Sequence, residues 1–433
     1  MSLKPLPTQV ADADFLVSHR HPSLFSEPGT GKTLTALEGY KKVGGRLVIV
    51  APPIALRMWE QNITDHLGAK VQRIKKRSDK LDKTADAYVL SYQMAHGFPD
   101  LAGADVLVLD ESDALKTLAS QRTVAVYGQR SSMMSCLAAG AEHIWPLTGT
   151  PIRRYADDLY PQLKALHPKL MRETLEITSL AAFQKVFCVS QMRRFHPRQP
   201  MTSVVMGNRN EALLNDFIYK NHLAVRRTIH DVSAHMPPLT IRTITVDYDD
   251  NEELREMTAK AAYVGEEDPI MATARRLVGT AKAKHVANYA LDVSNAIKSP
   301  ILILYWHKDV GTKMEEILRS KGQSVVKIDG ATSPDARYKA EQDFNDKKVD
   351  FMLGQISSMG VAINLQKGSH YAIFAEQDWS FAAQDQALRR LWRFGQQTHV
   401  QVDMCQAEHP IDEAVQSVNT RKEKSANKII NGV

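Results

Sequence analysis

Residues 26–33 read Ser-Glu-Pro-Gly-Thr-Gly-Lys-Thr, directly after a short apolar run and directly before a helical pattern. Gly29 and Gly31 let the backbone turn so that its N–H groups face an anion, and the following helix adds its positive amino end. Lys32 can reach the β- and γ-phosphates of a nucleotide, and the Thr33 hydroxyl can bind Mg²⁺. The predicted phosphate-binding residues are Gly29, Thr30, Gly31, Lys32 and Thr33. The alternative is a chance Gly-Lys-Thr in a turn.

A second stretch, residues 106–113, reads Val-Leu-Val-Leu-Asp-Glu-Ser-Asp. It puts two acids at the carboxyl end of an apolar strand, which is where ligands bind in open parallel sheets. We expect Asp110 to hold Mg²⁺ and Glu111 to orient and deprotonate the attacking water. A solvated strand end is the alternative, but a strand-end acid pair together with a phosphate-binding loop is much more specific than either motif alone. The combination predicts an ATPase that uses ATP and Mg²⁺.

The rest of the chain alternates short apolar runs with helical patterns. Continuous apolar runs are typical of strands that are buried on both faces of a parallel sheet. The expected strands are 46–51, 87–92, 106–110 and 143–147 in the first half, and 301–306, 324–329, 350–354, 371–375 and 400–405 in the second. The alternation predicts an α/β fold with two doubly wound parallel-sheet lobes. The middle, about 155–300, is expected to be mostly helical, and the domains are predicted as 1–235 and 236–433.

Composition sets wider bounds. The 433 residues are 43% hydrophobic and 24% charged, which is typical of a globular protein and unlike a disordered one. Three separate cysteines argue against a disulfide framework or a cysteine-rich zinc site, and no apolar run is long enough to span a membrane. The net charge of +6 divides into +7 on residues 1–200 and −1 on the remainder. This basic excess permits a nucleic-acid partner.

With these motifs in order, the chain resembles helicase superfamily two, and most closely its Swi/Snf-type branch of double-stranded-DNA translocases. The resemblance covers roughly residues 5–406. The matching segments are 50–53 with Trp59, 91–92, Leu-Thr-Gly-Thr-Pro-Ile at 147–152, 226–228, 236–238, 301–306, 329–332, 357–365, Asp-Trp-Ser at 378–380, and Gln-Ala-Leu-Arg-Arg-Leu-Trp-Arg-Phe-Gly-Gln at 386–396. The last segment is the most diagnostic, because it fits the branch's QAxxRxxRxGQ pattern. The resemblance implies two RecA-like lobes with helical insertions between them.

The resemblance also implies roles for particular residues. Gln9 would bind the adenine edge, although Thr8 stands where the family usually has Tyr. Gly360 of the second lobe would contact the nucleotide. On a helix, Gln386, Arg390 and Arg393 would share one face, so Arg393 would stabilise charge on the transferring γ-phosphoryl group with Arg390 beside it. An ordinary basic helix is the alternative. ATP with Mg²⁺ is expected between the two lobes.

The expected nucleic-acid contacts come from the same motifs. They are Pro53, Trp59, Ser91, Thr148, Arg153, Arg154, Ser358 and Trp379. Arg153 and Arg154 stand where the family favours Gln-Asn, which would shift contacts toward phosphate. Asp113 replaces the commoner His or Gln of the acid motif.

These observations predict a nucleic-acid-dependent ATPase that translocates on DNA, with duplex DNA favoured and no sequence preference. The first alternative is a helicase that separates or anneals strands on forked or branched DNA or R-loops. The second is a nucleotide-switched binding module without turnover. RNA stays open as a partner, and no membrane partner is expected. We expect a monomeric viral or prokaryotic protein in the cytoplasm, in preference to a nuclear one.

Overall fold

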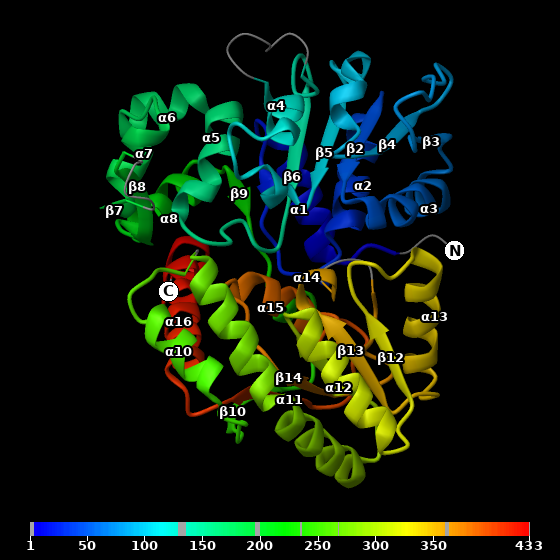
Figure 1. Cartoon of the computed structure of the whole chain (residues 1–433). Coiled ribbons are helices and arrows are strands. Elements are labelled where there is room, and N and C mark those ends of the chain that lie inside the picture. The colour runs from blue at the N-terminus through cyan, green and yellow to red at the C-terminus, as the bar shows by residue number, and fades with distance from the viewer. Residues whose placement is uncertain are drawn as a thin grey trace. The chain divides into compact units, whose positions relative to one another are not determined.

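A computed structural model describes residues 4–128, 136–194, 200–233, 236–266, 268–359 and 363–432. The chain divides into two compact units (Figure 1). Unit 1 consists of Met1–Ala234 and Lys422–Val433, and unit 2 of His235–Arg421. The predicted boundary after residue 235 differs from this division by one residue. The assignment of the whole of 236–433 to the second domain also differs, because Lys422–Val433 belong with unit 1.

The end of helix α16 (Pro410–Asn431) explains that difference. Helix α8 (Glu211–Lys220) of unit 1 carries Asn215 and Tyr219. Asn215 Nδ2 donates to the carbonyl of Ile429, and the Tyr219 hydroxyl donates to the carbonyl of Ile430, each at 2.7 Å. These bonds satisfy carbonyl groups that the end of a helix leaves without partners.

The sheet of unit 1 has seven parallel strands in the order β3-β4-β2-β5-β6-β1-β9. They span β1 Ser23–Leu24, β2 Leu47–Ala51, β3 Val71–Arg73, β4 Ala87–Ser91, β5 Val106–Asp110, β6 His143–Leu147 and β9 Ala224–Val225. Every residue of β2, β4 and β5 is buried, so the continuous apolar runs of the sequence do mark strands covered on both faces.

The helices of unit 1 lie before, between and after the strands along the chain. They are α1 Pro7–Ser18, α2 Lys32–Val43, α3 Leu56–Leu67, α4 Gln121–Tyr127, α5 Tyr160–Leu166, α6 Pro168–Leu175, α7 Leu180–Phe187, α8 and α9 Ile229–Val232, with short 3₁₀ turns at Pro53–Ala55, Ala95–Gly97, Pro99–Leu101, Ser112–Leu115 and Ala156–Leu159. Helix α3 shows how sequence sets a boundary. Its buried face contains Leu56, Trp59 and Ile63, and Gly68 ends it with a φ of 63°.

One part of the middle region, which the sequence predicts to be mostly helical, forms strands instead. Strands β7 (Cys188–Arg193) and β8 (Thr202–Asn208) form a separate antiparallel pair with a register shift at Val189/Ser190. Most of the β7 side chains are exposed, so this strand lacks the continuous apolar run by which buried strands are recognised in a sequence.

The sheet of unit 2 has six strands in the order β10-β15-β14-β11-β13-β12, all paired in parallel. They span β10 Leu239–Thr245, β11 Ile301–Tyr305, β12 Val325–Ile328, β13 Phe351–Gln355, β14 Tyr371–Phe374 and β15 Val400–Gln406. The helices are α10 Glu252–Ala261, α11 Pro269–Ile297, α12 Lys308–Ser320, α13 Pro334–Asn345, α14 Ile356–Met359, α15 Phe381–Leu388 and the start of α16. The predicted α/β fold with two parallel-sheet lobes is confirmed (Figure 1).

Candidate functional site

The carboxyl ends of three strands of unit 1 bring the predicted motifs to one edge of the sheet. In the register of the strands, Leu24 of β1 pairs with Leu147 of β6, and Leu147 pairs with Asp110 of β5. The phosphate-binding loop follows Leu24, and Thr148 follows Leu147. The loop, the acids and the Leu-Thr-Gly-Thr-Pro segment therefore start from neighbouring positions, at the edge where parallel sheets bind ligands.

The loop itself has the backbone of an anion site. Gly29 and Gly31 have φ values of 87° and 86°, in the left-handed region that favours glycine. Gly31 is also the N-cap of α2, whose first N–H groups have no partner within the helix. The Thr30 hydroxyl donates to the carbonyl of Glu27 at 2.8 Å, which holds the loop closed.

The side chain of Lys32 curls back over this loop. Its Nζ donates to the carbonyls of Ser26 at 2.9 Å and Glu27 at 3.3 Å. An ammonium group held against backbone carbonyls can exchange those weak acceptors for phosphate oxygens, which accept a charge-assisted hydrogen bond.

Gln9, on α1, lies against the same loop. Its Nε2 donates to the carbonyl of Thr30 at 3.2 Å, and its Oε1 accepts from the N–H of Leu6 at 2.8 Å. A Cβ atom at Gly31 would overlap Nε2 of Gln9. This contact requires glycine at position 31 and gives Gln9 a fixed place beside the loop.

Asp110 ends β5 as a buried carboxylate. Its Oδ2 accepts from Nε1 of Trp59 at 2.8 Å, and its Oδ1 accepts from the N–H of Glu111 at 3.1 Å. Burial, and next the charge of Glu111, raise the pKa of Asp110 to about 6, while the Trp59 hydrogen bond and the charge of Lys32 act in the opposite direction. A carboxylate in this environment favours a bound cation, because a cation would compensate its charge.

Glu111 has an unusual backbone and an unused side-chain oxygen. Its φ of 50° lies in the left-handed region, which is uncommon for a residue other than glycine. Its Oε2 is buried and has no hydrogen-bond partner among the residues that the structure describes. A buried carboxylate oxygen without a donor is costly, so this oxygen fits a site for a water molecule or another donor.

Asp113 links the acid motif to the Leu-Thr-Gly-Thr-Pro segment. The Thr148 hydroxyl donates to its Oδ1 at 3.0 Å and accepts from the N–H of Thr150 at 3.1 Å. Arg153 forms an ion pair with its Oδ2. Burial raises the pKa of Asp113 to about 6, against the lowering effect of Arg153. A change at the acids can therefore pass to residues 148–153 through direct contacts.

Several predicted nucleic-acid contacts of unit 1 have other surroundings. Trp59 has an exposed fraction of 0%, and its indole donates to Asp110. It therefore does not lie at the surface, contrary to its prediction as a nucleic-acid contact. Ser91 and Thr148 are also buried, and the Thr148 hydroxyl is bound to Asp113. Pro53 and Arg154 are exposed, as a surface contact requires.

In unit 2, the predicted helix over 386–393 ends too early. Helix α15 stops at Leu388, and Arg390 and Arg393 lie in the turns that follow, so they do not share a helix face with Gln386. Nη1 of Arg393 donates to Oδ1 of Asn364 and, at 3.5 Å, to the carbonyl of Ile363. Burial lowers the pKa of Arg393, against the effect of Glu341. Gly360 lies outside the described residues.

The glutamine that ends the diagnostic motif is structural. Gln396 is buried, its Nε2 donates to the carbonyl of Ser369 at 2.9 Å, and its Oε1 accepts from the N–H groups of Gln397 and Thr398. It therefore fixes the turn that follows Arg393. Ser358 and Trp379, the predicted nucleic-acid contacts of unit 2, are both half-buried.

Sequence reasoning missed three groups at these sites. The Trp59 indole and the Tyr92 hydroxyl both bind Asp110, the latter by donating to its carbonyl at 2.8 Å. Arg275 of unit 2 is buried and stacks on Trp379. The signal for Arg275 was available, since Arg275, Gly279 and Lys282 have the i, i+4, i+7 spacing of one helix face.

No described helix is long and apolar enough to cross a membrane. Comparison with known proteins identifies two domains. The SNF2-related domain matches residues 18–255, and the helicase conserved C-terminal domain matches residues 281–395.

Three relatives illustrate the range of similar proteins. DNA annealing helicase and endonuclease ZRANB3 of Mus musculus is 24% identical over 76% of this chain and 30% of its own length. The SWI/SNF-related matrix-associated actin-dependent regulator of chromatin subfamily A-like protein 1 homolog of Caenorhabditis elegans is 23% identical over 92% of this chain and 58% of its own length. An uncharacterized ATP-dependent helicase of Mycoplasma pneumoniae is 23% identical over 94% of this chain and 40% of its own length. The chain thus spans less than two thirds of these relatives.

Among solved structures, the Sulfolobus solfataricus SWI2/SNF2 ATPase core in complex with dsDNA is similar, with 17% identity, a TM-score of 0.46, and coverage of 100% of this chain and 94% of that one. The predicted Swi/Snf-type member of helicase superfamily two is confirmed by the domain matches. The SNF2-related domain covers more than half of the sequence, and the chain therefore belongs to the SNF2-related family.

Proposed function

We propose that this chain is a nucleic-acid-dependent ATPase that translocates on DNA, mainly duplex DNA, and couples ATP hydrolysis to remodelling of DNA or nucleoprotein. The observation that carries the proposal is the register of Leu24, Leu147 and Asp110. It gives the phosphate-binding loop and the acid pair one common edge, where the charge of Lys32 acts on Asp110.

ATP fits the loop. Two left-handed glycines, the amino end of α2 and a lysine are the groups that bind the phosphates of a nucleotide. Gln9, held against Thr30, is the candidate for the adenine edge.

Mg²⁺ fits the donor set beside the loop. Thr33 and Asp110 would hold it. Burial raises the pKa of the Asp110 carboxyl, and a bound cation would compensate the charge of the ionised form. When bound, Mg²⁺ would neutralise charge on the phosphates. Glu111, with its buried and unpartnered Oε2, would accept the proton of the attacking water.

Unit 2 would supply the remaining groups. We assign Arg393 and Arg390 to the charge that develops on the γ-phosphoryl group, and Gly360 to the nucleotide. Arg393 is now bound to Asn364, a neutral partner, so a phosphate could replace that bond without breaking an ion pair.

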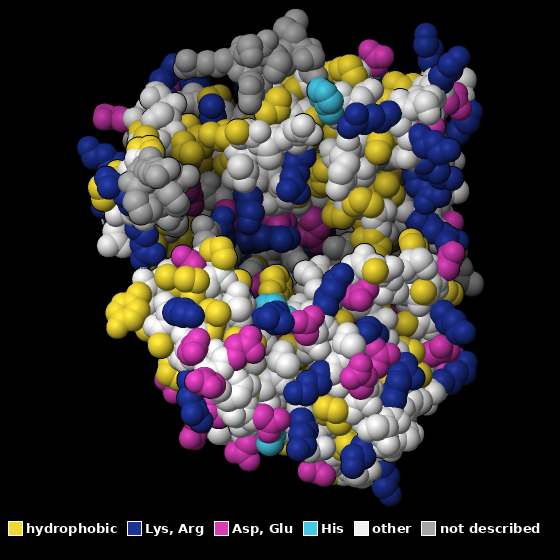
Figure 2. Space-filling view, in the orientation of Figure 1, with side chains coloured by type: hydrophobic (Ala, Val, Ile, Leu, Met, Phe, Trp, Pro, Cys, Tyr) yellow, Lys and Arg dark blue, Asp and Glu magenta, His cyan; other side chains and the backbone are white. Residues whose placement is uncertain are grey.

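DNA as the partner is supported by charge as well as by family. Residues 70–83 contain seven basic side chains (Lys70, Arg73, Lys75, Lys76, Arg77, Lys80, Lys83) and two acidic ones (Asp79, Asp82). Figure 2 shows Lys and Arg side chains gathered over the part of unit 1 where Figure 1 labels β3 and α3. Contacts with phosphate would make binding sequence-independent and salt-sensitive.

The test is phosphate release by the full chain without nucleic acid and with single-stranded DNA, duplex DNA, forked DNA or RNA. We expect duplex DNA to stimulate turnover most strongly. An absence of stimulation by every nucleic acid would contradict the proposal, and stimulation by RNA alone would replace DNA as the partner.

A second candidate is a helicase that anneals or separates strands on forked DNA or R-loops. The name of the ZRANB3 relative, a DNA annealing helicase, favours it. Displacement of a triplex strand without opening of a forked duplex indicates a translocase, whereas annealing or opening of the fork indicates the second candidate. Binding of ATP and DNA without any hydrolysis would instead indicate a nucleotide-switched binding module. The monomeric state, the cytoplasmic location and a viral or prokaryotic origin stay predictions.

A further inference from the structure

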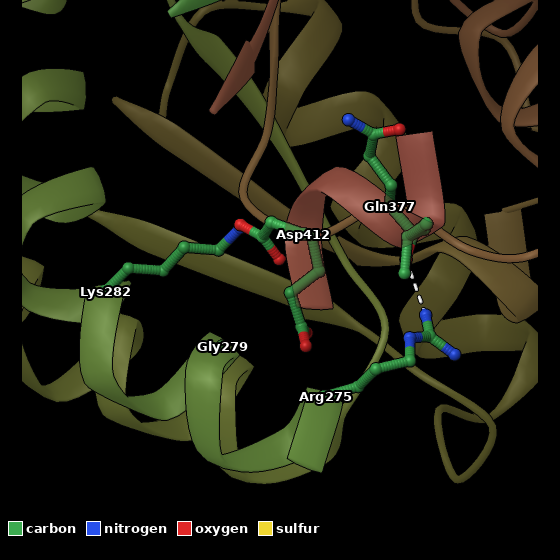
Figure 3. Close-up of a pocket in the computed structure, with 7 residues that line it drawn as sticks. Arg275, Gly279, Lys282, Gln377 and Asp412 are labelled. Atoms are coloured by element: carbon green, nitrogen blue, oxygen red, sulfur yellow. Dashed lines mark hydrogen bonds and ion pairs between the residues drawn. The ribbon is translucent and has the colours of Figure 1, made fainter. Parts of the chain in front are cut away.

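Helix α11 of unit 2 carries a stripe of three residues, Arg275, Gly279 and Lys282, at positions i, i+4 and i+7 (Figure 3). Arg275 has an exposed fraction of 8% and Lys282 of 2%. Burial of two cations on one helix face is expensive unless each has partners. Arg275 and Lys282 therefore need hydrogen-bonding or charged partners inside unit 2.

Arg275 holds the segment that leads from β14 to α15. Its Nη2 donates to the carbonyl of Gln377 at 2.6 Å. Its guanidinium carbon lies 5.1 Å from the ring centre of Trp379 and 6.0 Å from that of Trp306. Figure 3 shows the side chain of Arg275 extending from α11 toward Gln377. One buried side chain thus contacts the ends of two neighbouring strands, β14 and β11.

Glu376, which precedes Gln377 in the chain, binds the residues that follow β11. Its Oε2 accepts from the N–H groups of Trp306 and His307, each at 2.9 Å, and its Oε1 lies 2.7 Å from Nδ1 of His307. His307 is the N-cap of α12, so a carboxylate distant in sequence binds the backbone N–H groups at and just before the start of that helix. A Cβ atom at Gly279 would collide with Glu376 Oε1, which explains the glycine within the stripe.

Lys282 anchors the far end of the stripe. Its Nζ donates to the carbonyl of Cys405 at 3.0 Å and forms an ion pair with Asp412 at the start of α16 (Figure 3). Asp412 Oδ2 also accepts from the N–H of Ala407 at 2.9 Å. These contacts join α11, from which Arg275 projects, to the end of β15 and the start of α16.

We propose that Arg275 and Glu376 are positioning residues that hold the Asp378–Ser380 turn, and with it Trp379, in the orientation that grips nucleic acid. The inference rests on the proposed function, because Trp379 is the predicted nucleic-acid contact of unit 2. Two features favour positioning over simple stability. The network ends on two strand-end segments at the ligand edge of the sheet, and the guanidinium carbon of Arg275 lies over the ring of Trp379, a cation–π contact that an apolar packing residue could not make.

The adjacent Arg276 is a matched control. It lies on the same helix and is half-exposed, and its Nη1 forms a 2.8 Å ion pair with Asp309 at the surface. Such a pair contributes little to stability, and it does not touch the Asp378–Ser380 turn.

The experiment compares Arg275→Ala and Arg275→Lys with Arg276→Ala in the full chain, using ATP, Mg²⁺ and a duplex DNA of fixed length. In Arg275→Ala we expect the DNA concentration for half-maximal stimulation to rise about twofold to thirtyfold, the range of a lost cation–π contact. Arg275→Lys keeps the cation but loses the guanidinium bond to Gln377, so we expect a smaller rise. The KM for ATP should stay at the wild-type value, since Arg275 is not among the residues assigned to ATP. Arg276→Ala should match the wild type in both quantities.

A second readout does not depend on DNA. Acrylamide quenching of Trp379, taken as the difference between each variant and the same variant with Trp379→Phe, should increase in Arg275→Ala and not in Arg276→Ala. Equal quenching and equal half-stimulating DNA concentrations in the two arginine variants would overturn the proposal.

The two hypotheses fail separately. If the wild type is not stimulated by any nucleic acid, the proposed function fails, and unchanged quenching then overturns the positioning role as well. If the wild type is stimulated but the Arg275 variants respond to DNA as the wild type does, only the positioning role fails. Where Arg275→Ala does not fold, as judged by circular dichroism, Arg275→Lys decides by the same two measurements.

Discussion

The indole Nε1 of Trp59 donates a 2.8 Å hydrogen bond to Oδ2 of Asp110. The donor lies on α3 and the acceptor ends β5, and both side chains are buried. Asp110 is the proposed Mg²⁺ residue, so Trp59, which the sequence predicts as a nucleic-acid contact, instead orients that carboxylate.

Trp59→Phe should weaken that site. The ring volume is nearly kept, but Asp110 loses a donor that lowers its pKa, so more Mg²⁺ should be needed for half-maximal ATPase activity. The loss of the buried hydrogen bond should cost about 1 to 3 kcal/mol in the free energy of unfolding, measured with urea.

Trp145→Phe is the control for that change. Trp145 is equally buried, and its Nε1 donates to the carbonyl of Leu16 at 3.0 Å, away from the acids. We expect a similar loss of stability with no change in the Mg²⁺ requirement. A higher Mg²⁺ requirement in both variants would mean that stability alone causes the effect.

The two buried acids should make stability depend on pH. The pKa values of Asp110 and Asp113 rise from 3.8 to about 6 on folding, so the folded chain binds protons more tightly than the unfolded chain. Their contribution to stability is complete below about pH 4 and is lost as the pH rises through 6. Asp110→Asn should therefore raise the melting temperature more at pH 8 than at pH 4. Asp100→Asn, on the surface, should show no such difference.

Glu111→Gln should keep ATP binding and lose turnover. The amide retains the size of the side chain but accepts no proton, so we expect the rate to fall by about 10² to 10⁴. Binding of a fluorescent ATP analogue and phosphate release, each with duplex DNA, measure the two steps. Glu142→Gln, an exposed change in the same unit, should leave both intact. Turnover at the wild-type rate in Glu111→Gln would remove Glu111 from its proposed role.

Gly31→Ala should abolish nucleotide binding. The new Cβ would overlap Nε2 of Gln9 and would also require alanine at a φ of 86°. Gly44→Ala separates these two effects, because Gly44 is the C-cap of the same helix with a φ of 76° and open space around its Cβ position. We expect Gly44→Ala to cost about 1 kcal/mol in stability while nucleotide binding stays intact. Equal loss of binding in both variants would point to backbone strain rather than to the contact with Gln9.

The sequence predicts the fold well wherever burial is complete. Strands β5 and β6 have the predicted bounds, because each is a continuous apolar run between polar segments. Strand β10 was missed, since it lies at a sheet edge and all of its side chains are exposed or half-buried. The early end of α15 was missed because the arginine pattern continues past Leu388 whether or not the backbone stays helical.

The candidate site divides in the same way. The loop and the acid pair are local motifs, and their chemistry follows from residue types at short spacing. The contacts of Trp59 with Asp110, and of Arg153 with Asp113, join positions tens of residues apart. They depend on which strands become neighbours in the sheet, and a single sequence carries no direct record of that pairing.

Arg153 and Arg154 should differ although they are adjacent and both were predicted to bind nucleic acid. Arg153 forms an ion pair with the buried Asp113, whereas Arg154 is exposed. Arg153→Ala leaves a buried carboxylate without its cation, so it should cost about 1 to 3 kcal/mol in stability and lower basal ATPase activity. Arg154→Ala should leave basal activity near the wild-type value.

The salt dependence of DNA binding separates the two roles. If Arg154 contacts a phosphate, its loss should reduce the slope of log Kobs against log salt concentration by about 0.9, the value for one contact with duplex DNA. Arg153→Ala should leave that slope unchanged, because its guanidinium is already bound to Asp113. The slopes are obtained from duplex binding, measured by fluorescence anisotropy at salt concentrations from about 50 to 200 mM, a range of about fourfold. A smaller slope in Arg153→Ala, with basal turnover unchanged, would indicate that Arg153 contacts nucleic acid. The hydrogen bond from Thr148 would then be the contact that holds Asp113 in place.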